Sequence, residues 1–94
     1  MTLANIKSAI KRNRQNEKRR LRNRVYRGRA RSSIRKAQVQ IEDGDLQAAR
    51  EATIQAVSDL DKAAEKGVIH KNNASRRKSR LMKRLAKLEN QAAG

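Results

Sequence analysis

The most constraining feature of this chain is a run of ten residues, Lys11–Arg20, that contains no hydrophobic side chain. Lys, Arg, Gln and Glu favour helix, and the chain has no proline to interrupt one. A helix through this run is polar on every face, so it has no face to bury against a protein core. We therefore expect a basic helix that projects beyond whatever core the other residues form.

Two glycines divide the chain into three segments. Gly44 in "IEDGD" and Gly67 in "EKGVI" stand where a helix ends, because glycine adopts the left-handed backbone of a C-terminal cap without steric cost. Asp45 can cap a second helix, and Asn72 or Asn73 can cap a third. The segments predict an all-α, three-helix bundle with a long, basic N-terminal helix overhanging it. We expect a single domain over residues 1–94, with helices over about residues 3–43, 45–66 and 72–92.

Apolar residues recur every three or four positions, as on one face of a helix. The candidate core residues are Leu21, Val25, Ile34, Ala37, Ile41, Ala49, Ala52, Thr53, Ala56, Val57, Leu60, Ala63, Ala64, Ala74, Leu81, Leu85 and Leu88. Gly28 lies where a core residue would be expected, at a cost of about 0.5–1 kcal/mol relative to alanine. Leu, Ile and Val number only 17 against a net charge of +16. A chain of this composition buries little surface, so we expect marginal stability and ordering by a partner.

Helix lengths predict how the segments lie in space. A helix over residues 3–43 is about 60 Å long, and the second helix is roughly half that length. Short connections make consecutive helices antiparallel. The turn at residues 68–73 should therefore lie at the base of the projecting half, beside residues 18–24.

The charge is unevenly distributed. Residues 1–36 carry a net charge of +13, residues 37–67 carry −4, and residues 68–94 carry +7. Such density indicates a polyanionic partner, either nucleic acid or an anionic membrane. Arg19, Arg20, Arg22 and Arg24 cannot share one helical face, which favours insertion among folded RNA segments over docking on one smooth duplex. The alternative is a solvated, partly disordered basic tail.

Several classes of protein do not fit the composition. Without cysteine there are no disulfides or thiolate metal sites, and no apolar run is long enough for a membrane span or a secretory signal. With Tyr26 as the only aromatic residue, a base-stacking platform is missing. A membrane-active amphipathic peptide is disfavoured by the acidic middle segment and the lack of aromatic anchors. We expect a cytosolic protein with no cofactor.

His70 is the only histidine of the chain, so its role has to be weighed. A metal site needs about three or four ligands, and no second histidine or cysteine exists. Nucleophilic catalysis would need a poised serine and an orienting acid, but the surroundings are basic. Two compatible interpretations remain open. His70 is either a turn residue whose ring bonds a free backbone group, or a contact to nucleic acid made together with Lys71 and Asn72.

Three stretches resemble one family. "ANIKSA" (residues 4–9), "IEDGD" (41–45) and above all "KGVIHKNNASRRKSRL" (66–81) are similar to bacterial small-subunit ribosomal protein S20, over essentially the whole chain. The resemblance implies a three-helix bundle with a long first helix that binds small-subunit ribosomal RNA early in assembly. It assigns RNA contacts to the basic helix over residues 7–31, to the turn at residues 69–72 and to residues 76–80. The chain departs from the family pattern at Gly28 and Ser32, where the family usually has Ser and Thr. The first departure removes a hydroxyl contact.

The expected function is therefore non-catalytic: a structural constituent of the small ribosomal subunit that binds its RNA and stabilises RNA folding during assembly, in the cytoplasm. The expected partners are small-subunit ribosomal RNA and the small-subunit particle, with no membrane, metal or small-molecule substrate. A DNA-compacting architectural protein of similar charge is the alternative, because phosphate contacts do not depend on sequence. The predicted RNA-binding residues are Asn5, Lys7, Lys11, Arg12, Arg14, Lys18, Arg19, Arg20, Arg22, Asn23, Arg24, Arg27, Arg31, His70, Lys71, Asn72, Arg76, Arg77, Lys78 and Arg80.

Overall fold

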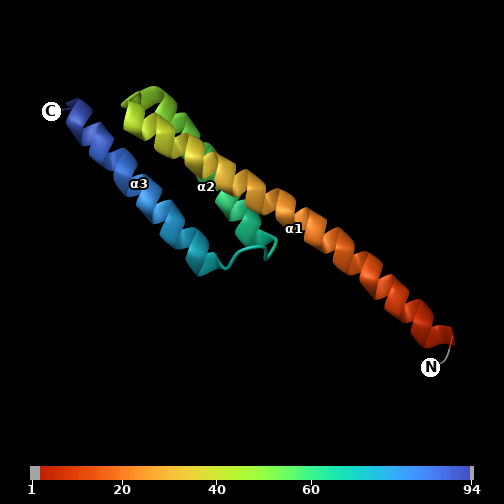
Figure 1. The fold of residues 1–94 in the computed structure, drawn as a ribbon. Helices are drawn as coiled ribbons and strands as arrows, with labels where there is room; N and C mark the ends of the chain where they lie inside the picture. The colour runs from red at the N-terminus through yellow and green to blue at the C-terminus, as the bar shows by residue number, and fades with distance from the viewer. Residues whose placement is uncertain (1–2, 94) are drawn as a thin grey trace.

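The computed structural model describes residues 3–93 and folds them into three helices, α1 (Leu3–Asp43), α2 (Leu46–Glu65) and α3 (Lys71–Ala93) (Figure 1). The described residues form no strand, and the predicted all-α bundle with a long first helix is confirmed. Its principal extents of 73 × 20 × 13 Å describe a rod, because α1 continues far beyond the other two helices. The expected single domain over residues 1–94 reaches beyond the described residues at Met1, Thr2 and Gly94, and stays a prediction.

The two glycines that divide the chain lie at helix ends with positive φ, +79° at Gly44 and +73° at Gly67. After α2, the N–H of Gly67 donates to Ala64 O and the N–H of Val68 donates to Ala63 O, at 3.0 and 2.9 Å. This pair of bonds satisfies carbonyls that the helix end would leave free. At the start of α2, Asp45 Oδ1 accepts from the N–H of Ala48 at 3.2 Å, which is the predicted cap.

The predicted cap of the third helix is wrong. α3 begins at Lys71, one residue earlier than expected, and His70 takes the cap position in place of Asn72 or Asn73. His70 Nδ1 accepts from the backbone N–H of Asn72 at 3.1 Å, and His70 O accepts from the N–H of Ala74 at 3.1 Å. The physical reason is that Nδ1 stands as many bonds from the backbone as the Oδ1 of aspartate or asparagine. It can therefore satisfy the same free N–H.

The core between α1 and α2 is built mainly of alanine. Ala37, Ala49, Ala56 and Ala63 are completely buried, and Leu60 is the only large side chain buried to the same extent among the described residues. Alanine has almost no side chain to separate two backbones, so the helices can approach closely along this stripe. α3 adds two buried hydrophobic residues from its helix, Ala74 and Leu81. The core is therefore narrow, with little apolar area to stabilise it.

A polar contact fixes the register of α1 against α2. Ser33 Oγ donates a hydrogen bond to Asp59 Oδ2, and Gln55 Nε2 donates to Asp59 Oδ1 at 3.2 Å. Ser33 and Asp59 are both buried, with exposed fractions of 9% and 8%. A buried carboxylate without these donors is costly, so sliding the helices past each other is penalised.

This register determines how much of α1 extends beyond the other two helices. Since the helices are antiparallel, Glu65, six residues beyond Asp59, lies level with about Arg27. The turn that follows reaches the level of about Arg22. Residues 5–22 are accordingly all exposed. We call residues 3–22 the overhang, and Figure 1 shows it projecting from the bundle.

Two further expectations about which residues of α1 lie in the core are wrong. Leu21 and Val25 are not core residues, because their exposed fractions are 55% and 51%. They lie at the end of α1 that α2 barely reaches. Gly28 is exposed, and a Cβ added to it would meet nothing within 4 Å, so it does not lie where a core residue would sit.

We predict that Ser33→Ala destabilises the chain by about 1–3 kcal/mol, because Asp59 keeps its burial but loses a donor. Chemical denaturation followed by circular dichroism at 222 nm measures the change. Ser32→Ala is the matched control, since it makes the same change at the exposed neighbouring position. Equal stabilities of the two variants would show that the buried pair does not fix the register.

We also predict that Gly28→Ala stabilises α1 by about 0.5–1 kcal/mol, because the position is helical, exposed and open to a Cβ. The contrasting variant is Gly67→Ala, whose φ of +73° strains any other residue and whose substitution should destabilise. Thermal melts compare the two with the parent chain. A lower melting temperature for Gly28→Ala would contradict the assignment.

Candidate nucleic-acid interface

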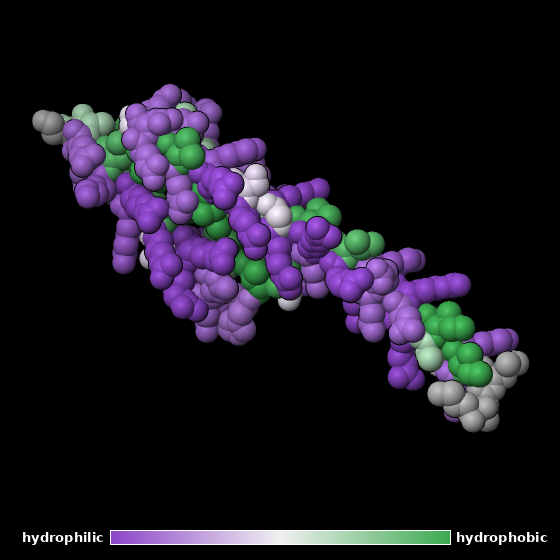
Figure 2. Space-filling view, in the orientation of Figure 1, coloured by the Kyte–Doolittle hydropathy of each residue, from purple (hydrophilic) through white to green (hydrophobic). Residues whose placement is uncertain are grey.

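The overhang is a single helix with cations on all sides. It carries eight Lys and Arg residues and one acid, Glu17, which forms an exposed ion pair with Arg20 at 2.8 Å. In Figure 2 the overhang is largely hydrophilic, apart from green patches, one of them near its N-terminal end. No other helix of the described chain packs against it. An exposed ion pair such as Arg20–Glu17 contributes little to the stability of the overhang. The position of the overhang therefore depends on α1 staying helical along its whole length.

The α2–α3 turn lies at the base of the overhang. Ile69 packs against the hydrophobic core, while His70, Lys71 and Asn72 are exposed. In the antiparallel register this turn is level with Asn23, the first residue of α1 after the overhang that is not fully exposed. Figure 1 shows the turn beside α1 at this level. The structure therefore brings the turn together with the second half of the basic run, as the helix lengths predicted.

The predicted site residues do not all come together. All twenty are exposed except Asn23 and Lys78, which are half-buried. The N-terminal part of the overhang extends away from the turn and from α3 (Figure 1). Lys78 faces α2, where its Nζ lies 2.7 Å from Asp61 Oδ1, so an acid already neutralises it. The side-chain oxygen of Asn23 is buried without a hydrogen-bond partner.

The structure confirms the first of the two interpretations of His70 left open by the sequence, and the contact to nucleic acid stays a prediction. The Nδ1 of His70 accepts the cap hydrogen bond, so the neutral ring carries its proton on Nε2. The ring is exposed, which leaves this N–H as a donor at the corner between the overhang and α3. Capping α3 and contacting a phosphate oxygen therefore use different nitrogens of the same ring. The two roles are compatible.

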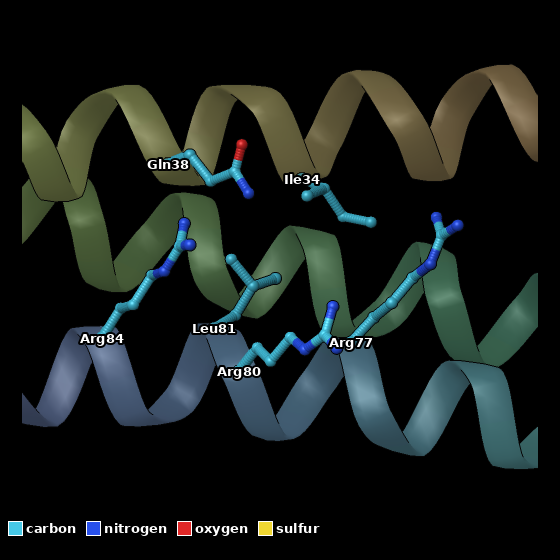
Figure 3. Close-up of a pocket in the computed structure, with 6 residues that line it drawn as sticks. All are labelled: Ile34, Gln38, Arg77, Arg80, Leu81 and Arg84. Carbon is cyan, nitrogen blue, oxygen red and sulfur yellow. The ribbon is translucent and has the colours of Figure 1, made fainter.

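Sequence reasoning missed two residues that line a groove between α1 and α3. The groove has a volume of about 260 Å³, and Figure 3 shows Gln38 of α1 facing Arg84 of α3 across it. The sequence contained part of the signal, because Arg77, Arg80 and Arg84 repeat at helical spacing and share one face. Gln38 could not be found in this way, because its place opposite Arg84 depends on how α3 packs against α1.

The described residues offer little for other chemistry. Among residues 3–93 no group of three or more His, Cys, Asp or Glu side chains could hold a metal ion. No helix within the same range is both long enough and apolar enough to cross a membrane. The ring of Tyr26 is half-buried, with the guanidinium of Arg29 at 6.0 Å from its centre, so the single aromatic residue is already engaged.

The fold and the surface charge together define the class: a small, strongly basic helical protein whose cations are exposed far beyond its own core. Comparison with known proteins identifies the family within that class. The model of the family described as "Ribosomal protein S20" matches residues 4–86, and the chain belongs to this family of structural ribosomal proteins.

Individual relatives agree with this assignment. The chain is 57% identical over 82 residues to a protein of Thermomicrobium roseum, covering 87% of this chain and 83% of the relative. It is 54% identical over 84 residues to a protein of Salinispora tropica, covering 89% and 96%. It is 52% identical over 87 residues to a protein of Geobacillus kaustophilus, covering 93% and 98%. All three relatives are named small ribosomal subunit protein bS20.

We predict that His70→Ala destabilises the chain by about 0.5–2 kcal/mol, the usual cost of losing an N-cap. His70→Asn should retain nearly all of the stability, because the asparagine oxygen can accept from the same N–H of Asn72. Thermal melts of both variants measure the difference. Equal losses in the two variants would show that capping is not what the ring contributes.

Proposed function

We propose that this chain is a structural constituent of the small ribosomal subunit, which binds directly to small-subunit ribosomal RNA and stabilises its folding during assembly. Family membership and the names of the relatives support the ribosomal role. The observation that carries direct RNA binding is the overhang, a stretch of helix with eight cations and one acid whose residues 5–22 are all exposed. The proposed location is the ribosome in the cytoplasm.

The proposed mechanism is electrostatic. RNA segments that converge in a fold bring their phosphates close together, and their repulsion opposes packing. A helix with arginines around its whole circumference can neutralise phosphates on several sides at once, releasing condensed counterions. The planar guanidinium also binds phosphate through two parallel hydrogen bonds. The overhang would therefore stabilise a junction of RNA helices by occupying the space between them.

The charge of the bundle orients the protein in this proposal. Residues 37–67, which contain all of α2, carry a net charge of −4, while both flanking segments are basic. Glu51, Asp61 and Glu65 are exposed on α2. RNA is repelled by that side and attracted to α1 and to the start of α3. The proposed interface thus comprises the overhang, the α2–α3 turn and the exposed arginines of α3, whereas Lys78 stays paired with Asp61.

A salt titration with a charge-matched pair of variants tests this interface. The test variant combines Arg12→Gln, Arg14→Gln and Arg19→Gln in the overhang. The control combines Lys62→Gln, Lys83→Gln and Lys87→Gln, which remove the same charge from α2 and α3. For transcribed small-subunit ribosomal RNA, the plot of log affinity against log salt should become shallower by about 0.7–0.9 for each lost phosphate contact, hence by about two for the test variant. The control should keep the parent slope.

Two outcomes would overturn the proposal. One is a parent slope near one, which would mean that most cations are bystanders. The other is equal slopes for the test and control variants, which would mean that net charge alone matters. Co-sedimentation addresses the DNA-compacting alternative, because a chain that follows the nucleoid and is never found in small-subunit particles would support that alternative.

A further inference from the structure

The groove between α1 and α3 differs in chemistry from the overhang. Ile34 and Gln38 line it from α1, and Arg77, Arg80, Leu81 and Arg84 line it from α3. In Figure 3, Leu81 rises between the arginines, Ile34 and Gln38 extend from α1 toward α3, and the side chain of Arg84 rises toward Gln38. The groove thus combines apolar side chains, one amide and three guanidinium groups, whereas the overhang presents cations to open solvent.

Among residues 3–93, no ion pair neutralises the arginines of this groove. No acidic residue lines it, and none of the three arginines belongs to an ion pair of the described residues. Glu89 of α3 and Asp61 of α2 pair elsewhere, with Arg50 and with Lys78. Three guanidinium groups within two helical turns repel one another. All three arginines are exposed, so solvent screens much of this repulsion, and an anion in the groove would remove what remains of it.

The remaining lining residues indicate which anion. A phosphate on a duplex surface needs only exposed cations, which the overhang supplies, and a double helix cannot enter a groove between two packed helices. An unpaired nucleotide offers a phosphate to the arginines and a flat base to a guanidinium plane or to the aliphatic side chain of Ile34. The amide of Gln38 carries both donors and an acceptor, as the edge of a base requires.

We propose that the groove between α1 and α3 binds one unpaired nucleotide of the ribosomal RNA, with its phosphate on Arg77, Arg80 and Arg84 and its base beside Ile34 and Gln38. This inference rests on the proposed function and adds a second contact of a different kind. The overhang binds phosphates irrespective of sequence, whereas the groove holds a base that has left its stack. The groove also joins α1 to α3, so the nucleotide would link two helices that share few buried side chains.

Three single variants of the full chain test the groove, with circular dichroism melts confirming that each is folded. Arg84→Gln should weaken binding to transcribed small-subunit RNA about tenfold and make the salt slope shallower by about 0.7, the value for a single-strand contact. Lys83→Gln, the control, removes the same charge from the adjacent residue, which lines a different hollow with Ser79 and Met82. Its binding should change less than twofold. Gln38→Ala should weaken binding without changing the salt slope, because it removes a neutral contact to the base.

Chemical probing of the RNA bases provides the second measurement. The parent chain should protect the base of one unpaired nucleotide, and Gln38→Ala should lose that protection while the protections due to the overhang remain. If Arg84→Gln binds like Lys83→Gln, the groove is not a binding site. If Arg84→Gln weakens binding but Gln38→Ala leaves both affinity and base protection unchanged, the groove holds a backbone phosphate only, and the nucleotide proposal fails. Failure of the parent chain to bind the RNA would instead overturn the proposed function itself.

Discussion

The close contact between α1 and α2, together with the Ser33–Asp59 hydrogen bond that fixes its register, determines the rest of the structure. Alanine side chains let the two backbones approach, and the buried carboxylate permits one alignment. The lengths of the helices then leave the first twenty-odd residues of α1 extending beyond α2 and α3. The exposure of the basic surface is thus a consequence of this register. If α2 packed against α1 closer to the N-terminus of α1, it would bury part of that surface.

The sequence predicted most of the fold, because the signals it uses are local. Gly44, Gly67 and Asp45 end and begin helices through bonds to residues within five positions, and such chemistry can be read along the chain. The sequence also predicted that the His70 ring could bond a free backbone group, which it does through Nδ1, but it assigned the cap itself to Asn72 or Asn73 because histidine is not among the usual capping residues. The burial of Leu21 and Val25 was predicted wrongly, since apolar periodicity identifies a face of a helix but does not say how far the neighbouring helix extends.

The candidate interface also has a part that the sequence predicts and a part that it does not. The cations of the overhang follow from composition, and the place of the turn at its base follows from helix lengths. The groove could not be predicted, because Gln38 and Arg84 are 46 positions apart in the sequence and meet only through the packing of α3. The pairing of Lys78 with Asp61 also depends on tertiary structure, and it separates one predicted cation from its sequence neighbours.

The continuity of α1 has a further consequence, for distance. A single unbroken helix joins Arg12 in the overhang to Gln38 at the groove, with no proline along its length. At the rise of an α-helix these two residues are about 39 Å apart along the axis. If RNA binds both at the overhang and at the groove, the rigid length of α1 sets the distance between the two bound RNA segments. The spacing would be imposed by the protein and not by the RNA. Gly28 lies between the two sites, and because glycine is the least restricted residue, α1 bends most easily there.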